Sequence, residues 1–100
     1  MLSIRFNPKH EWWVSGTTFD RLFQLALDSG KMSPNLEHWR HVADANGGLD
    51  LSTMEPSETD ELVAALRYTA ERELARLGNV DPASEDEAYR IGLLKLLEVT

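Results

Sequence analysis

The most regular alternation of apolar and polar positions lies between residues 57 and 78. Apolar residues recur there every three or four positions, as on one face of a helix: Val63, Leu66, Ala70, Leu74 and Leu77, widened by Leu62 and Ala65. The opposite side carries charge: Arg67, Glu71, Arg72, Glu73 and Arg76. Ser57 with Asp60 has the spacing of a capping box, and Gly78 suits a helix end. The pattern predicts a long amphipathic helix.

Two shorter helices are predicted before this segment. Thr17 with Asp20 again gives a cap-and-acid spacing, so a helix is expected over about 18–29, ended by Gly30. Ser33 and Pro34 predict another start, with a helix over about 34–45 that stops at 46–48. The expected inner faces are Phe19, Leu22, Phe23 and Ala26, then Leu36, Trp39, Val42 and Ala43. In the connection that follows, the residues expected to hold the loop on the core are Leu49, Leu51 and Met54.

The C-terminal segment 85–98 is apolar on nearly all sides. Ser84 and Glu87 have capping-box spacing, which predicts a last helix that is buried or covered by a partner. Because short apolar runs are ambiguous, a closing strand over 93–100 remains the alternative.

The N-terminal residues have a different period. Residues 2–6 alternate between apolar and polar, 7–10 are typical of a turn, and 11–14 are expected to return as a second strand. A lone hairpin is marginal in water, so it must pack on the helices. The whole chain, 1–100, is therefore predicted to be one mainly α (α+β) domain: a compact bundle of about four helices with a short N-terminal β-hairpin.

Composition narrows the setting. The 100 residues include no cysteine, which excludes disulfides and thiolate chemistry. No apolar run approaches the length of a bilayer span, and residues 1–6 are too short and too polar for a signal peptide. We therefore expect a cytoplasmic protein without a membrane partner.

The net charge of −7 is unevenly distributed. Segments 41–66 and 77–89 together hold ten acidic residues and no Lys or Arg. This excess argues against binding nucleic acid and is compatible with a basic protein partner. First helical turns account for six of the ten: Glu58, Asp60, Glu61, Glu85, Asp86 and Glu87. An acidic binding face and a merely solvated surface both remain open, since antiparallel last helices would place their acidic starts at opposite ends.

Few residues suggest catalysis. His38, His41 and Asp44 fall on one predicted helix row and could present ligands to a metal, but no HExxH signature and no distant ligand accompany them. No phosphate loop or nucleophile motif appears either. We expect exposed histidines, no cofactor and no enzymatic activity.

Adjacent tryptophans raise a question about the hairpin. On a strand, Trp12 and Trp13 point to opposite faces. Exposed tryptophan is frequent at binding hot spots, and we expect Trp12 to be the exposed one.

The cysteine-free acidic chain, its aromatic-bearing hairpin, and the Gly47–Ser52 lead-in to an acidic helix after Pro56 resemble a bacterial immunity protein of a contact-dependent growth inhibition or polymorphic toxin system. The resemblance implies a protein that binds a cognate toxin domain, often a nuclease, and blocks its active site or substrate groove. A nuclease groove is basic because it holds phosphates, so an acidic inhibitor can compete for it.

The resulting hypothesis is an immunity protein whose acidic surface occludes a basic toxin, which the resemblance implies to be a nuclease. The expected contacts are Asp44, Asp50, Glu55, Glu58 and Glu61, with Trp12 as an aromatic anchor. Two alternatives are kept: a self-associating structural or regulatory domain that dimerises through its C-terminal helix, and a small metal-dependent enzyme that uses His38, His41 and Asp44.

Overall fold

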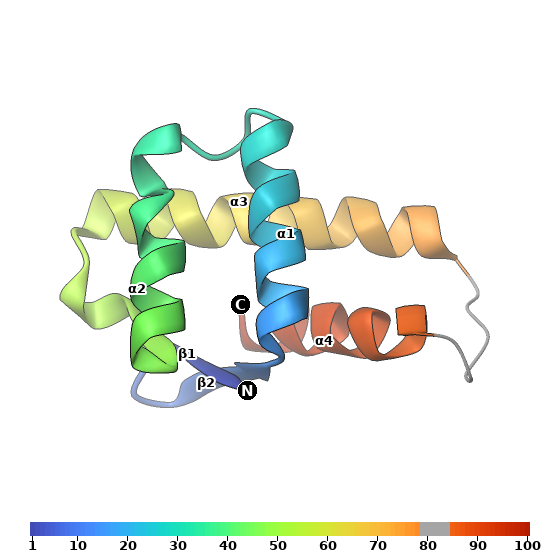
Figure 1. Cartoon of the computed structure of the whole chain (residues 1–100), viewed down its shortest axis with the longest axis horizontal. Helices are drawn as coiled ribbons and strands as arrows, with labels where there is room; N and C mark the ends of the chain where they lie inside the picture. The colour runs from blue at the N-terminus through green and yellow to red at the C-terminus, as the bar shows by residue number, and fades with distance from the viewer. Residues whose placement is uncertain (79–84) are drawn as a thin grey trace.

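The structure is a computed structural model that describes residues 1–78 and 85–100. Its helices are α1 (Gly16–Asp28), α2 (His38–Asn46), α3 (Pro56–Leu77) and α4 (Glu85–Val99), as Figure 1 shows. Its strands are β1 (Leu2–Asn7), β2 (His10–Val14) and β3 (Gly48–Asp50), and its short 3-10 helices are η1 (Pro34–Leu36) and η2 (Leu51–Thr53). The fold is mainly α with a small β-sheet, as predicted.

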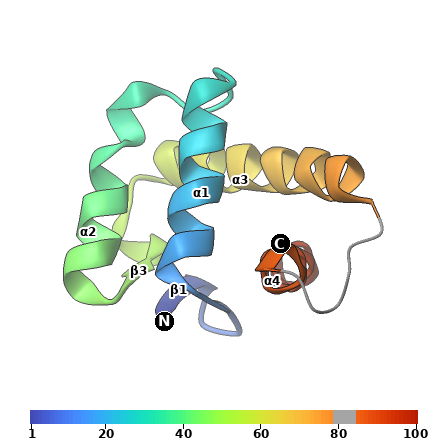
Figure 2. The ribbon, with the colours of Figure 1, turned by 45° about the vertical axis from the view of Figure 1, so that its right-hand side comes forward.

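Helices α1 and α2 both cross α3, and α4 packs against α3 (Figure 1). Helices α1 and α2 run in opposite directions across α3 (Figures 1 and 2), and α4 returns towards the start of α3 at an angle to it, since Figure 2 shows α4 end-on and α3 from the side. The sheet lies beneath α1 and α2, with strand order β2-β1-β3. The predicted hairpin is confirmed as the antiparallel pair β1–β2. Strand β3 pairs parallel with β1 and was not predicted.

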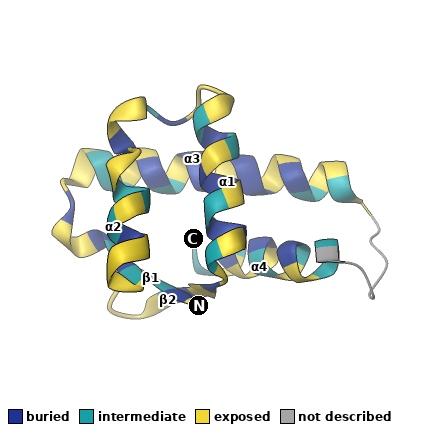
Figure 3. Cartoon of the chain, in the orientation of Figure 1, coloured by how far each residue is buried: buried dark blue, intermediate teal, exposed yellow. Residues whose placement is uncertain are grey.

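The sheet buries one face only. Alternation along the strands turns Leu2, Ile4, Trp12, Val14 and Leu49 into the core. The predicted inner face of α1 is confirmed, and Leu62, Ala65, Leu66 and Ala70 bury the centre of α3 (Figure 3). Leu51 and Met54 are buried as expected, so the connection between β3 and α3 is held on the core.

Two predicted helix starts are wrong by one or two residues. Ser15 caps α1, since its Oγ accepts a hydrogen bond from the Thr18 N–H; Thr17 does not. Helix α3 begins at Pro56, because proline fits the first helical position, so Ser57 lies inside the helix and is not its cap. The predicted cap Ser84 lies outside the described residues.

The predicted helix over 34–45 is divided. Ser33 begins it as expected, accepting a hydrogen bond from the Asn35 N–H, but residues 34–36 form η1 and only His38–Asn46 is α-helical. Gly47 then ends α2 with a positive φ of 71°. Gly48 is already part of β3, opposite Ser3, and a Cβ there would collide with the Ser3 carbonyl.

Helix α4 settles the C-terminal ambiguity. Residues 85–99 are helical, so the strand alternative for 93–100 is wrong. Tyr89, Leu93 and Leu96 are buried, whereas Ile91 and Leu94 are exposed. The helix is therefore only partly covered within the chain.

A buried carboxylate ties three helices together. Glu73, expected on the polar side of α3, is instead only 8% exposed. It accepts hydrogen bonds from the Tyr89 hydroxyl of α4 at 2.9 Å and from Arg76 Nε at 2.7 Å. Arg21 of α1 lies 3.9 Å from the centre of the Tyr89 ring and pairs with Asp86 at 3.5 Å. The Arg76 hydrogen bond, above all, lowers the pKa of Glu73, and burial together with the Glu73 hydrogen bond raises the pKa of Tyr89.

The close approach of β3 to β1 predicts a strict requirement for glycine at position 48. Gly48→Ala should lower the free energy of unfolding by about 1–3 kcal/mol, because the strands must separate to admit a methyl group. Gly16→Ala is the matched control: a Cβ there meets nothing within 4 Å, and the change should be neutral or stabilising by about 0.4–1 kcal/mol. Urea unfolding measures both; equal stability of the two variants would contradict the β1–β3 pairing.

The Glu73 network predicts a pH dependence. A carboxylate whose pKa is lowered by folding stabilises the folded chain above the unfolded pKa, ordinarily 4.5, and loses that contribution as the pH falls through the folded pKa. Glu73→Gln should therefore cost about 1–3 kcal/mol at neutral pH and progressively less below pH 4.5. The exposed Glu71→Gln on the same helix should stay within about 0.5 kcal/mol of wild type. A Glu73→Gln deficit that is constant with pH would contradict this assignment.

Candidate partner-binding surface

The acidic residues of segment 41–66 gather at one end of the molecule. We call them the acidic end: Asp44, Asp50, Glu55, Glu58, Asp60 and Glu61. They come from α2, from the β3–η2 connection and from the start of α3, which lie together at the left of Figure 1. Within residues 1–78 and 85–100, none of the six forms an ion pair with Lys or Arg. Their charge is therefore left to attract ions or a partner.

The second acidic segment has a different environment. The described residues of this segment begin α4, which starts at the opposite end of α3 from the acidic end (Figure 1). Asp86 pairs with Arg21, and Glu87 pairs with Arg90 at 3.9 Å. The two acidic segments therefore do not merge, and in the second segment Asp86 and Glu87 are paired with arginines.

Three residues of the acidic end also stabilise the fold through hydrogen bonds. Asp50 Oδ1 accepts hydrogen bonds from the Ser52 N–H at 3.0 Å and the Ser52 hydroxyl at 2.7 Å, which lowers the pKa of Asp50. Glu58 accepts from Trp39 Nε1 at 2.9 Å, and Glu61 accepts from the backbone N–H of Ser33 at 2.7 Å. These bonds fix the carboxylates in place and connect α3 to α2 and η1.

Asp44 and Glu55 have no such structural role over the described residues. Both are exposed, and no side-chain hydrogen bond to either is present in the described part of the chain. Asp44 faces α1, where its charge, after burial, is a cause of the raised pKa of Asp20. Substituting Asp44 or Glu55 should therefore change charge with little effect on packing.

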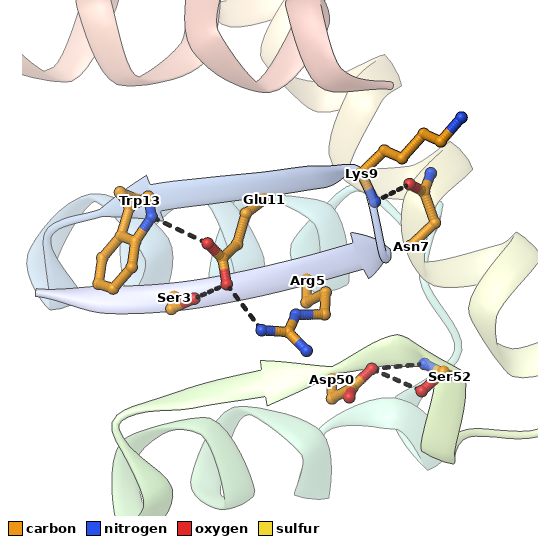
Figure 4. Close-up of polar contacts among 8 residues, drawn as sticks. All are labelled: Ser3, Arg5, Asn7, Lys9, Glu11, Trp13, Asp50 and Ser52. Carbon is orange, nitrogen blue, oxygen red and sulfur yellow. Dashed lines mark hydrogen bonds and ion pairs between the residues drawn. The ribbon is translucent and has the colours of Figure 1, made fainter.

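The outer face of the sheet adjoins the acidic end. Glu11 lies at the centre of this outer face. Its Oε1 accepts hydrogen bonds from the Ser3 hydroxyl at 2.9 Å and from Arg5 at 3.4 Å, and its Oε2 accepts one from Trp13 Nε1 at 3.2 Å (Figure 4). The Ser3 bond, foremost, lowers the pKa of Glu11. Arg5 stands opposite Asp50 in the register of β1 and β3, without an ion pair between them, so the polar row on the sheet continues to Asp50 of the acidic end.

A shallow hollow of about 470 Å³ lies where the outer face of the sheet meets α2. Ser3, Arg5, Glu11 and Asp50 line it from the sheet, and Trp39, Val42 and Asn46 line it from α2. It is a polar depression suited to a protruding side chain of a partner more than an enclosed ligand site.

The prediction about the two tryptophans is reversed. Trp12 is only 1% exposed; its ring packs 6.4 Å from that of Phe19, and its Nε1 donates to the Gly92 carbonyl at 2.9 Å. Trp13 is 53% exposed on the outer face of the sheet. The signal for this was the period of two: Trp12 shares its side of β2 with Val14, and it pairs with the apolar Ile4. Trp12 is therefore a core residue, and Trp13 is the available aromatic.

The histidine row offers no metal centre in the described chain. His38 and His41 are exposed, and His38 Nδ1 lies 2.8 Å from the Asn35 carbonyl oxygen. No group of three or more potential ligands comes together among residues 1–78 and 85–100. Over the same residues, no helix is long and apolar enough to cross a bilayer.

Comparison with known proteins finds no matching family model, no matching curated protein and no matching solved structure. The site must therefore be interpreted from its own residues.

The double role of Glu58 predicts a measurable structural cost. Glu58→Ala should lower the free energy of unfolding by about 1–2 kcal/mol, because it leaves the half-buried Trp39 Nε1 without its acceptor. Asp60→Ala, on the same helix and exposed, should change stability by less than about 0.5 kcal/mol. Urea unfolding followed by tryptophan fluorescence distinguishes the two; an equally small effect of both would show that the Trp39 bond contributes nothing.

Proposed function

We propose that this chain is an immunity-type inhibitor that binds a basic toxin domain and occludes its substrate groove. The kind of toxin that we propose is a nuclease. The observation that carries the proposal is the acidic end, six carboxylates with no ion pair to Lys or Arg within the described residues. The resemblance of the chain to immunity proteins of polymorphic toxin systems supports the same role.

The physical basis is competition for a phosphate-binding surface. A nuclease must carry cationic side chains where the nucleic-acid backbone binds. Carboxylates on a folded scaffold offer such a surface an alternative partner that it cannot cleave. Because hydrogen bonds already hold Asp50, Glu58 and Glu61, these side chains lose little further conformational entropy on binding.

One observation favours a second candidate function. Ile91 and Leu94 are 41% and 43% exposed on α4, as they would be on a helix that pairs with a second copy. A self-associating domain would sediment as a dimer at high protein concentration, whereas the inhibitor proposal expects a monomer before its partner is added.

On this proposal we expect the gene immediately upstream of this chain to encode a large secreted protein, and the decisive probe is the C-terminal domain of that protein. Expressed alone, that domain should arrest growth; co-expression of this chain should restore growth, and the two should co-purify. The absence of such a neighbouring gene, or arrest that this chain does not relieve, would overturn the proposal.

With that domain as probe, charge at the acidic end should control the rate of association. Asp44→Asn with Glu55→Gln should slow association about tenfold at low ionic strength, while leaving the urea midpoint unchanged. Asp28→Asn with Glu71→Gln removes the same charge from exposed positions outside the acidic end and should slow it by about twofold or less. Surface plasmon resonance over a salt series provides the measurement. Equal effects of the two pairs would mean that net charge, and not the acidic end, attracts the partner.

A further inference from the structure

The exposed apolar residues of the chain are not scattered. Among the described residues, the large hydrophobic side chains with high exposure are Met1, Trp13, Tyr68, Ile91 and Leu94. All but Tyr68 come from the N-terminus, β2 and α4, and we call these four the apolar seam. Met1, Trp13 and Ile91 line one hollow of about 140 Å³ between β2 and α4. Lys95 lies at the same hollow, and Leu94 is exposed elsewhere on α4. Exposed apolar side chains grouped at a hollow on a charged protein are typical of an interaction site.

The packing of α4 explains why the seam is open. Gly92 brings α4 close to the start of α1 and the end of β2: a Cβ there would lie 3.3 Å from the Thr18 methyl group and 3.9 Å from a Val14 methyl group. Trp12 Nε1 then reaches the Gly92 carbonyl at 2.9 Å. With Leu93 and Leu96 turned into the core, Ile91 remains outside, beside Trp13, and Leu94 also stays exposed on the same helix.

Trp13 joins the seam to the acidic end. Its Nε1 donates to Glu11 at 3.2 Å, and Glu11 stands opposite Arg5 in the sheet. Arg5 in turn is the register partner of Asp50 in β3, and no ion pair joins the two side chains (Figure 4). One surface therefore continues from the apolar hollow across the outer face of the three strands to Asp50, the member of the acidic end on the sheet.

We infer that the apolar seam is the contact centre of the interface with the basic domain, and that the hollow between Trp13 and Ile91 receives an apolar or aromatic side chain of that domain. This inference rests on the proposed function. Charge selects this occupant over a second copy: two copies would each bring a net charge of −7, whereas a basic domain is attracted to the adjoining acidic end. An apolar centre beside a charged border is the usual anatomy of a specific interface.

The two parts of the surface then have separable roles. Unpaired surface charges accelerate encounter and are sensitive to salt, while buried aromatic anchors slow dissociation. The acidic end should therefore govern the association rate constant, and the seam should govern the dissociation rate constant.

The experiment measures both rate constants with the toxin domain encoded upstream as the immobilised probe. Trp13→Ala and, separately, Ile91→Gln should each raise the dissociation rate about tenfold or more and change the association rate by about twofold or less. Tyr68→Ala is the matched control, since it removes an exposed aromatic outside the seam and should change neither. The urea midpoint of each variant verifies that it is folded; Ile91→Gln keeps a helix-forming residue in place.

The outcomes separate the two proposals. If the wild-type chain does not bind the domain, both are overturned. If it binds, and both seam variants dissociate no faster than Tyr68→Ala, the seam inference alone is overturned and the proposed function stands. A wild-type dimer in sedimentation that Trp13→Ala converts to a monomer would also overturn the inference, since the seam would then be occupied by a second copy.

Discussion

The parallel pairing of β3 with β1 is the constraint on which the arrangement of the surface depends. It requires Gly48, because any side chain there would collide with the Ser3 carbonyl. The pairing anchors the residues between α2 and α3 beside the hairpin and sets Asp50 opposite Arg5. Asp50 of the acidic end is therefore fixed on the outer face of the sheet next to β1, and the connection that follows it leads into the acidic start of α3.

The regular elements were predictable because their periods are long enough to be read. The hairpin repeats every two residues, and the faces of α1 and α3 repeat every three to four. Strand β3 has three residues and no period, so only its partner β1 defines it. The burial of Glu73 was equally hidden: Arg76 is its partner on the same helix, but Tyr89 and Arg21, which also contact it, come from other helices. Long-range contacts decide such positions, and local patterns do not record them.

The candidate surface was half predictable for the same reason. Counting charges identified the two acidic segments, but the fold decides whether arginines neutralise them. Arg21 and Arg90 pair with acidic residues near the start of α4. In the described structure no Lys or Arg forms an ion pair with Asp44 or Glu55 of the first segment. The exposed tryptophan was assigned to the wrong position although the alternation in β2 already placed Trp12 on the side of Val14. The register of Trp12 with Ile4 agrees with that alternation, burying Trp12 and exposing Trp13.

A surface of this kind needs its two parts together. Exposed apolar side chains would ordinarily favour self-association, and the hollow beside Trp13 and Ile91 has no cover within the described chain. A net charge of −7 opposes contact between copies while favouring a basic partner. Under the proposed function, charge would decide which molecule approaches the seam, and apolar contact would decide how long it stays. Neutralising the acidic end would then weaken both the attraction to a basic partner and the repulsion between copies, so the same carboxylates would serve specificity in both ways.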